Sequence, residues 1–396
     1  MSSTPSKPIR SGVARPPKVA LLVEMSNAYA RGLLSGIEDY IRSHGPWNVY
    51  LAEHGRGDLP PKWLRGWDGD GILARIENSG IAEVLAKASQ PVVDLSSRRL
   101  LPHVPSVTTD NATIASVALQ HFVERGYTHF AYCGDSRFGW SDDRGEHFRS
   151  LVASRKFHCE NYTTASAEQS DSDAETDRIA AWLQDLPKPI AVFACYDARG
   201  QQVLDACRRA NLSVPEEVAV LGVDNDELIC SLSPPPLSSI IPNPQKSGWT
   251  AAANLDRLMR GETVPPVATY IPPLGVAARQ SSDTLAVDDP QIAKVLRFIR
   301  EHACTGIGVG EVLQHCPMGR RSLEHRMKAI LGRTPHEEIF RVRMNHAKQL
   351  LTGTELKIAE IAERCGFLNV EYLSGSFRRA TNMSPSEYRK AFGTGK

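Results

Sequence analysis

The sequence predicts an α/β domain of two doubly wound lobes, followed by an all-α domain that contains two helix-turn-helix units. Three observations lead to this prediction. Short apolar runs alternate with helical patterns from residue 18 onward, an octet near the C-terminus recurs 49 positions later, and basic residues are concentrated after residue 290. We expect a flexible tail at 1–17, the α/β domain at 18–284, a linker at 285–291 and the all-α domain at 292–396.

The overall composition is that of a soluble globular protein in a reducing compartment. The 396 residues are 41% hydrophobic and 23% charged, and they include no apolar run long enough to span a membrane. The N-terminal tail is polar and proline-rich and lacks the apolar segment of a secretory signal. Eight cysteines are scattered without a C-x-x-C pair, which argues against a disulfide framework and a zinc site. We therefore expect a cytoplasmic protein that contacts no membrane and binds no metal or other cofactor.

The net charge of +1 conceals an asymmetry along the chain. From residue 290 onward there are 18 Lys and Arg against 10 Glu and no Asp, a net charge of +8. The preceding residues hold 28 basic and 35 acidic side chains, a net charge of −7. A basic C-terminal domain on an acidic body favours an anionic polymer as partner, although a merely solvated basic face explains the charge equally well.

The acidic body shows two series of strand and helix patterns. The first has strand-like runs at 18–24, 47–53, 70–76 and 91–96 and helical patterns at 28–43 and 113–126. The second has strand-like runs at 129–135, 191–197 and 218–226. Strands that alternate with helices form parallel sheets with helices on both faces, and ligands bind beyond the carboxyl ends of such strands.

The predicted strand ends of the body are polar. The candidate ligand-binding residues there are Glu24, Ser26, Tyr29, Asp197, Asp224 and Asn225. Carboxylates and amides accept hydrogen bonds from neighbouring hydroxyl groups, and an aromatic ring such as Trp140 offers a flat platform, so the set suits a sugar. A single Asp at a strand end is more often a helix cap, but several converging strand ends weaken that interpretation.

The basic domain contains a repeated unit. Residues 309–316 read VGEVLQHC and residues 358–365 read IAEIAERC, with apolar side chains at the spacing of one helix face. The similarity continues downstream, where Leu323 is mirrored by Leu373 and Met327 by Phe377. Cys316 and Cys365 are expected to be small buried hydrophobic residues. Two copies of one supersecondary unit explain this pattern.

Each copy has a short helix, a turn with glycine, and a second helix with an exposed polar face. This is the arrangement of a helix-turn-helix motif, in which the second helix enters the major groove. An ordinary helical hairpin would explain one copy, but two copies with matched turns disfavour it. A long amphipathic helix at 337–351 joins the units. The candidate DNA-binding residues are Arg320, Arg321, Glu324 and Lys328 in the first unit and Asn369, Glu371, Ser374 and Arg378 in the second.

The segments RRSLEHRMKAILGRTPHEEIFRVRMNHAKQLL and IAEIAERCGFLNVEYLSGSFRRATNMSPSEYR resemble the AraC-type DNA-binding domain. The resemblance covers roughly the last hundred residues and implies two helix-turn-helix units that read adjacent faces of the major groove. Two positions depart from the family pattern. Gly375 stands where an Arg is usual in the second recognition helix, and His325 stands where the first copy often has Arg.

The body resembles the periplasmic-binding-protein-like regulatory domain of the LacI-type regulators. The motifs are Asp110-Asn followed by Ala115, then HFVERG at 121–126, Asp197-Ala and GVDN at 222–225. The resemblance places Arg144, Phe148, Asp197 and Asp224 at effector-contacting positions. It also places residues 242–244 at a crossover between the lobes.

A regulatory body in front of an AraC-type domain resembles the family of bacterial xylose operon regulators. NAYARGLLSGIEDYI, CYDARGQQVLDAC and EEVAVLGVDNDELICSLSPPPLSSI support this resemblance over nearly the full chain. It implies D-xylose as the effector, operator DNA as the partner and transcriptional activation as the outcome, which would involve RNA polymerase. We also expect a homodimer that reads two operator half-sites.

Three alternatives to this interpretation differ in class. An enzyme is disfavoured because the sequence has no dinucleotide-binding glycine motif after a strand, P-loop, H-E-x-x-H or G-x-S-x-G motif. A transport-type binding protein would need an export signal and would not need a basic double helix-turn-helix domain. A regulator for another pentose, a hexose or a polyol remains open, since the same side chains would bind those ligands.

The segment after the body is expected to couple the two domains. Residues 281–290 are polar and end at Pro290, and Ile292, Val295, Leu296 and Ile299 then form one apolar stripe. We expect this helix to pack on the body or on a partner subunit instead of forming a free tether.

Overall fold

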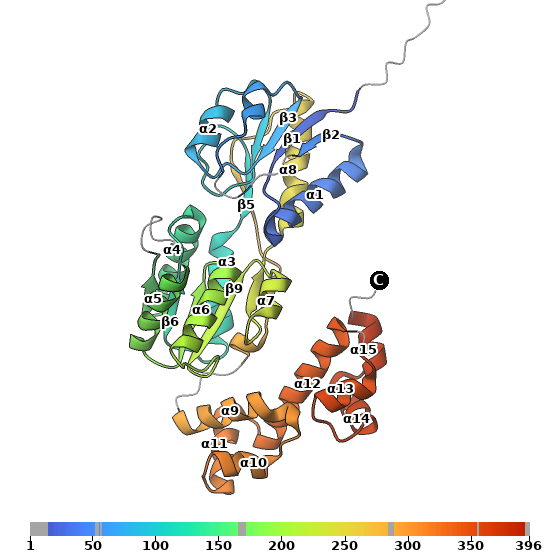
Figure 1. The fold of residues 1–396 in the computed structure, drawn as a ribbon. Helices are drawn as coiled ribbons and strands as arrows, with labels where there is room; N and C mark the ends of the chain where they lie inside the picture. The colour runs from blue at the N-terminus through green and yellow to red at the C-terminus, as the bar shows by residue number, and fades with distance from the viewer. Residues whose placement is uncertain are drawn as a thin grey trace, which may run out of the picture.

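The computed structural model describes residues 15–51, 55, 58–164, 172–283, 289–354 and 356–392. Two α/β lobes stand above a helical C-terminal domain (Figure 1). Most of the predicted tail and of the predicted linker lies outside the described residues. In the part of the chain that the structure describes, every helix is too short or too polar to cross a bilayer.

The N-terminal lobe is a parallel six-stranded sheet in the order β11-β5-β4-β3-β1-β2. Its strands are β1 (Lys18–Leu22), β2 (Asn48–Leu51), β3 (Gly71–Ala74), β4 (Val92–Asp94), β5 (Ser106–Thr109) and β11 (Ala268–Ile271). Its helices are α1 (Ala28–His44), α2 (Ser79–Leu85) and α8 (Pro244–Met259). The continuous apolar runs of β1 and β3 are almost fully buried, as central strands of a two-faced parallel sheet require.

The C-terminal lobe has the same architecture with one antiparallel edge. Its strand order is β12-β10-β9-β8-β6-β7, and β12 runs antiparallel to β10. The strands are β6 (Phe130–Cys133), β7 (Cys159–Tyr162), β8 (Ile190–Ala194), β9 (Val218–Val223), β10 (Ser238–Ile241) and β12 (Gly275–Ala277). The helices are α3 (Asn111–Val123), α4 (Gly139–Ser154), α5 (Ser172–Asp185), α6 (Asp197–Arg209) and α7 (Glu227–Leu232). The predicted strands and the two-lobed α/β fold are therefore confirmed.

The chain crosses between the lobes three times. It passes from β5 to α3, from β10 to α8, and from β11 to β12. Residues 242–244 lie on the second crossing, which confirms the predicted crossover. Each crossing leaves a sheet at the carboxyl end of a strand. The carboxyl ends of both sheets therefore face one another across the junction.

Helices α1 and α8 touch backbone to backbone in the N-terminal lobe. A Cβ on Gly36 would lie 2.0 Å from the Gln245 carbonyl oxygen, and one on Gly248 would lie 2.0 Å from that of Leu33. Any side chain at these two positions would force the helices apart. The glycines therefore fix the position of α1, whose first turn carries Tyr29.

The C-terminal domain consists of two helix-turn-helix units joined by α12. Its helices are α9 (Pro290–His302), α10 (Val309–His315), α11 (Arg320–Leu331), α12 (Pro335–Gly353), α13 (Ile358–Arg364), α14 (Val370–Thr381) and α15 (Pro385–Phe392). The repeated octets form α10 and α13. Each unit has its own core, with Leu323 and Met327 in one and Leu373 and Phe377 in the other. Cys316 and Cys365 are buried, as predicted.

Helix α9 contacts the body, as predicted, but through polar side chains and not through its apolar stripe. Its apolar stripe of Ile292, Val295, Leu296 and Ile299 is buried in the core of the first helix-turn-helix unit. The cause is that Leu323 and Met327 of the same unit need a third helix to cover them. The body is contacted instead by Arg297 and Arg300 on another side of α9.

His121 joins α3 to the segment that leaves the body. Its Nε2 lies 2.8 Å from the Ser282 hydroxyl, and burial, with a contribution from Arg125, lowers its pKa to about 3. Because the unfolded chain takes up this proton near pH 6.5 and the folded chain does not, the free energy of unfolding should fall as the pH drops below about 6.5. We expect a loss of at most about 1.4 kcal/mol per pH unit from this group.

Urea unfolding of the full chain between pH 5 and pH 8 measures this contribution. His121→Gln should have a shallower pH dependence than the unaltered protein, since Gln cannot take up a proton. Parallel curves for the two proteins would contradict the prediction.

Candidate functional site

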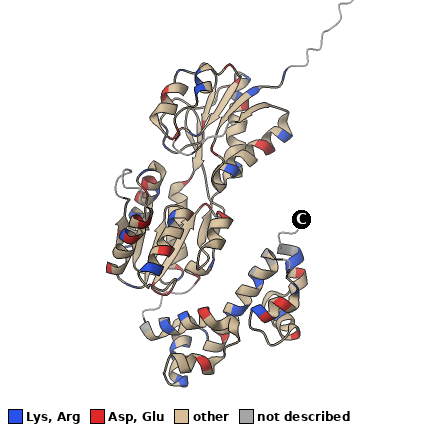
Figure 2. Cartoon of the chain, viewed as in Figure 1, with Lys and Arg blue, Asp and Glu red and all other residues tan. Residues whose placement is uncertain are grey.

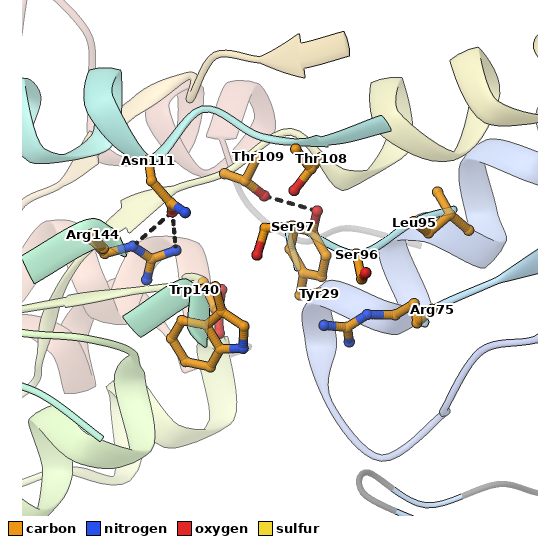
Figure 3. Close-up of a pocket in the computed structure, with 11 residues that line it drawn as sticks. Tyr29, Arg75, Leu95, Ser96, Ser97, Thr108, Thr109, Asn111, Trp140 and Arg144 are labelled. Atoms are coloured by element: carbon orange, nitrogen blue, oxygen red, sulfur yellow. Dashed lines mark hydrogen bonds between the residues drawn. The ribbon is translucent and has the colours of Figure 1, made fainter. Parts of the chain in front are cut away.

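A cavity lies between the two lobes, at the carboxyl ends of both sheets (Figure 3). The N-terminal lobe and the crossing after β5 supply most of its walls, and α4 and the loop after β9 supply the rest. The described residues that line it are Tyr29, Arg75, Leu95, Ser96, Ser97, Thr108, Thr109, Asn111, Trp140, Arg144 and Asp224.

The N-terminal wall is built around Tyr29 and Arg75. The Thr109 hydroxyl donates to the Tyr29 hydroxyl over 2.8 Å, and the Arg75 guanidinium lies 5.6 Å from the centre of the Tyr29 ring. Glu24 and Glu77 form ion pairs with Arg75. Because two carboxylates hold this buried guanidinium, Arg75 stays charged and directed at the cavity. Burial raises the pKa of Tyr29, so its hydroxyl keeps its proton.

The C-terminal wall is built around Trp140 and Arg144 from α4. The Arg144 guanidinium lies 5.2 Å from the centre of the Trp140 ring, and its Nε and Nη2 donate to the Asn111 side-chain oxygen over 3.1 and 3.0 Å. Trp140 stacks on Phe138 with ring centres 5.2 Å apart and an angle of 11°. These contacts give the wall a flat aromatic surface beside a fixed cation (Figure 3).

The loop after β9 brings the carboxylate of Asp224 to the cavity. Asp224 and Asn225 have positive φ angles of 109° and 49°, a backbone conformation that residues other than glycine rarely adopt. The surrounding bonds impose it, because the Asp224 amide donates to the Ile240 carbonyl and the Asn225 amide to the Ser239 hydroxyl. Strained backbone of this kind is typical of ligand-binding loops.

Four of the eight predicted ligand-binding residues, Tyr29, Trp140, Arg144 and Asp224, line the cavity. The other four, Glu24, Ser26, Asp197 and Asn225, are not among its described lining residues. Glu24 lies behind the wall and orients Arg75, and Ser26 is exposed. Phe148, which the family resemblance also suggested, is fully buried in the core of the C-terminal lobe.

Asp197 and Asn225 have structural partners that explain their absence from the cavity. Asp197 accepts hydrogen bonds from the Ser239 hydroxyl at 2.5 Å and the Asp226 amide at 2.7 Å. Burial, together with the nearby charge of Asp224, raises the pKa of Asp197 well above its ordinary value. The Asn225 side-chain oxygen accepts from Arg279 over 2.8 Å. Asp197 thus ties the first turn of α6 to the neighbouring strand ends.

Seven of the lining residues were not among the predicted ligand-binding residues. They are Arg75, Leu95, Ser96, Ser97, Thr108, Thr109 and Asn111. All follow or end a predicted or observed strand of the N-terminal lobe, or open the helix after it. The rule that selected Glu24, a polar residue at the end of a predicted strand, applies equally to Arg75, Ser96 and Ser97. The predicted strands do not include residues 106–109, so Thr108 and Thr109 carry no such signal.

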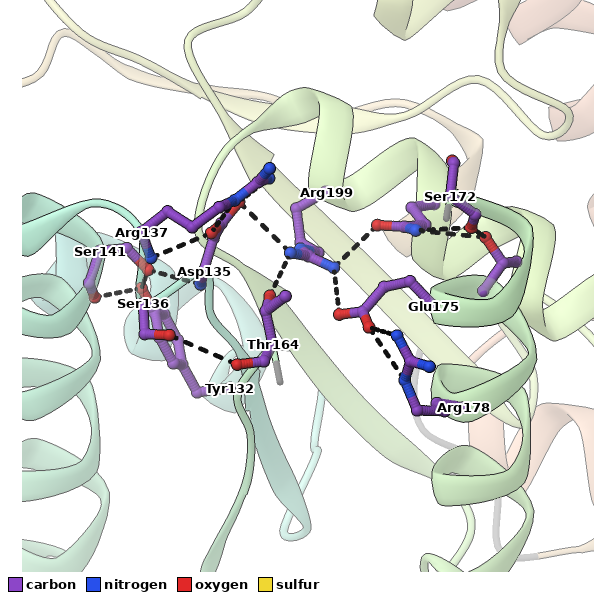
Figure 4. Close-up of polar contacts among 12 residues, drawn as sticks. Tyr132, Asp135, Ser136, Arg137, Ser141, Thr164, Ser172, Glu175, Arg178 and Arg199 are labelled. Carbon is purple, nitrogen blue, oxygen red and sulfur yellow. Dashed lines mark hydrogen bonds and ion pairs between the residues drawn. The ribbon is translucent and has the colours of Figure 1, made fainter. Parts of the chain in front are cut away.

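A charged network lies at the carboxyl ends of β6 and β7 (Figure 4). The Arg199 guanidinium lies 3.3 Å from both Asp135 and Glu175 and donates to the Thr164 hydroxyl over 2.6 Å. Asp135 also pairs with Arg137 at 2.6 Å. The network joins the ends of β6 and β7 to α5 and α6. It therefore holds the segment before Trp140 in place without reaching the cavity.

The predicted DNA-binding residues lie on α11 and α14 and in the turn before α14. Arg320, Arg321 and Lys328 are exposed, while Glu324 is half-buried and pairs with Arg320 at 3.0 Å. In the second unit Glu371 and Arg378 are exposed and Ser374 is half-buried. Asn369 caps α14, because its side-chain oxygen accepts from the Tyr372 amide over 2.8 Å. Lys and Arg are spread over both units (Figure 2).

The DNA-binding domain is attached to the C-terminal lobe by two groups of polar contacts. In the first, Arg300 forms an ion pair of 2.7 Å with Glu216 and donates to the Val214 carbonyl over 3.0 Å, and Arg297 donates to the Ser213 hydroxyl over 3.0 Å. In the second, Arg341 of α12 pairs with Asp283 at 2.7 Å. Only 2% of the Glu216 surface is exposed, so its carboxylate is buried in the first contact.

Family models match three stretches of the chain. Residues 18–112 match the XylR N-terminal domain, residues 119–282 match the periplasmic binding protein-like domain, and residues 313–391 match a helix-turn-helix domain. Together they cover both lobes and both helix-turn-helix units.

Relatives of similar length match across almost the whole chain. The xylose operon regulatory protein of Escherichia coli K12 is 32% identical over 94% of this chain and 96% of its own length, and that of Haemophilus influenzae is 31% identical over 94% and 98%. The solved structure of the xylose-binding transcription activator XylR superposes with a TM-score of 0.83 at 32% identity, over 96% of this chain and 99% of that one. The chain therefore belongs to the family of xylose operon regulatory proteins.

Proposed function

We propose that this protein is a transcriptional activator that binds D-xylose between its lobes and operator DNA through α11 and α14. One observation carries the proposal. A single chain contains a polar cavity between its lobes and a double helix-turn-helix domain that is attached to the C-terminal lobe. The relatives named for xylose have this order of domains along nearly their whole length.

The chemistry of the cavity supports a small polyhydroxyl ligand. Arg75 and Arg144 supply hydrogen-bond donors from opposite lobes, and Asp224 supplies an acceptor. The rings of Tyr29 and Trp140 offer flat apolar surfaces for the carbon-bound hydrogens of a sugar ring. A ligand that touches both lobes stabilises their closed arrangement, because it binds the closed state more tightly than the open one.

The rest of the proposal concerns organisation. We assign effector binding to residues 18–284 and DNA binding to residues 292–396, with α9 starting at Pro290. The protein acts as a homodimer in the cytoplasm, recruits RNA polymerase and catalyses no reaction. Calorimetric titration with D-xylose, L-arabinose, D-ribose, D-glucose and xylitol tests the effector, and binding of any of the others more tightly than D-xylose would contradict it.

Arg321 offers a test of the first reading helix. It is exposed at the start of α11, where side chains that read bases cluster, whereas Arg320 is paired with Glu324. If Arg321 reads a base, Arg321→Ala should weaken operator binding by about 1–3 kcal/mol and relax the preference at one base pair. If it touches only phosphate, the salt dependence of binding should become shallower by about one unit.

A matched control separates this effect from net charge. Arg208→Ala removes an exposed arginine from α6 of the body and should leave operator affinity nearly unchanged. Equal affinities of the Arg321→Ala variant and the unaltered protein at every salt concentration would exclude α11 from the groove.

A further inference from the structure

The two reading helices present different chemistry. On α11 the exposed face carries Arg320, Arg321 and Lys328. In the second unit the exposed residues include Leu368 in the turn before α14 and Glu371 and Gly375 on the helix. No cation stands on α14 before Arg378, so its first two turns cannot form the bidentate arginine contact with guanine.

Leu368 is the most exposed large apolar side chain among the described residues, at 91%. Its backbone is held on both sides. Phe367 is buried in the core of the second unit, and Asn369 caps α14. Gly366 has φ +70°, and a Cβ there would lie 2.8 Å from the Cys304 carbonyl, so the turn has little freedom to bury Leu368.

The space around Gly375 allows close approach of another molecule. A Cβ on Gly375 would meet no atom within 4 Å, and Gly375 is exposed one helical turn after Glu371. Arg378 and Arg379 follow one turn later and are exposed, at the spacing needed to contact phosphates flanking a groove that the first turns enter.

In the major groove of DNA the C5-methyl group of thymine is the apolar feature that distinguishes bases. We propose that Leu368 reads a thymine methyl group, so that the second unit recognises its part of the operator mainly by apolar contact. The first unit recognises its part by hydrogen bonds. This inference rests on the proposed function, because it requires α14 to enter the groove.

Leu368 also borders an apolar hollow between the units, together with Phe340, Phe367 and Tyr372. A protein segment seated in this hollow is the competing explanation of the exposed leucine. DNA is favoured because Leu368 lies directly before the N-cap of α14, the predicted reading helix, and because the domain is basic.

The test uses the full chain and a duplex selected by that chain from random-sequence DNA in the presence of D-xylose. Each thymine of the duplex is replaced in turn by deoxyuridine, which removes only the methyl group. We expect affinity to fall about fourfold at one or two positions within the half-site of the second unit, as the loss of one buried methyl group predicts. The same positions occupied by 5-methylcytosine, in an otherwise matched C·G pair, should bind more tightly than unmethylated cytosine.

Variants link the effect to the residue. Leu368→Ala should bind the thymine and uracil duplexes equally, Leu368→Met should keep the preference for thymine, and Leu228→Ala, an exposed leucine of α7, should behave as the unaltered protein. Since Leu368 is exposed, none of these changes should alter folding.

The outcomes separate the inference from the proposed function. If the unaltered chain selects no duplex, the proposed function fails. If it binds a duplex but deoxyuridine has no effect at any position, or if Leu368→Ala keeps the full effect, DNA binding stands and this inference is overturned. Either of these two outcomes with a bound duplex would assign Leu368 to the apolar hollow and a protein partner.

Discussion

Asp224→Asn is expected to weaken D-xylose binding by about tenfold to more than a hundredfold, which corresponds to about 1.5–3 kcal/mol for a hydrogen bond to a charged group. The substitution removes the carboxylate charge that Asp224 contributes to the cavity and keeps the size of the side chain. Asn is preferable to Ala because φ is 109° at this position, and Asn tolerates positive φ better than Ala does.

Calorimetric titration with D-xylose measures this effect, and DNA binding without sugar should be preserved. Ser26→Ala is the matched control, since Ser26 also follows a strand of the body but is exposed and outside the described lining of the cavity. Equal sugar affinities of a folded Asp224→Asn variant and the unaltered protein would remove Asp224 from the site. A loss in Ser26→Ala equal to that in Asp224→Asn would show that the cavity is misplaced.

Arg300→Glu is expected to abolish the effect of D-xylose on operator affinity while leaving sugar binding intact. The ion pair of Arg300 with Glu216 is the most buried polar contact described between the DNA-binding domain and the C-terminal lobe. Reversing the charge of residue 300 places two carboxylates together. Removing one partner of a buried pair costs about 3–5 kcal/mol, so the substitution should break this group of contacts. Two sites remain coupled only while a shared element responds to both.

Operator titrations with and without D-xylose measure the coupling. The double variant Arg300→Glu with Glu216→Arg should restore part of it, because the opposite charges meet again. Arg297→Ala is the matched control, since Arg297 is more exposed and reaches the body only through the Ser213 hydroxyl. If the Arg300→Glu variant responds to sugar as the unaltered protein does, coupling passes through Asp283 and α12 or through a partner subunit.

The helical units were predictable because their information is local. The spacing of apolar residues in VGEVLQHC and IAEIAERC specifies a helix face within eight residues, and the turns are marked by glycine. The capping of α14 by Asn369 is local in the same way, since a cap needs only the amides that follow it. The burial of Leu373 and Phe377 followed from the same periodicity.

The packing of α9 was less predictable, because one amphipathic stripe fits any apolar surface. The sequence predicted that Ile292 and Ile299 would be buried, but the partner depends on which uncovered core lies nearest in space. That core belongs to the first helix-turn-helix unit, whose Leu323 and Met327 would otherwise face water.

By itself, the sequence determined the two-lobed fold, the double helix-turn-helix domain and the presence of polar strand ends, since periodicity and turn chemistry act over a few residues. Only the tertiary structure decided which strand ends meet. Asp197 and Asp224 both follow strands of one sheet, yet Ser239 and the Asp226 amide hold the first away from the cavity while the second reaches it. Arg75 joins Arg144 at the cavity only because three crossings hold the lobes face to face, and hydrogen-bond geometry between distant segments leaves no periodic trace in a chain.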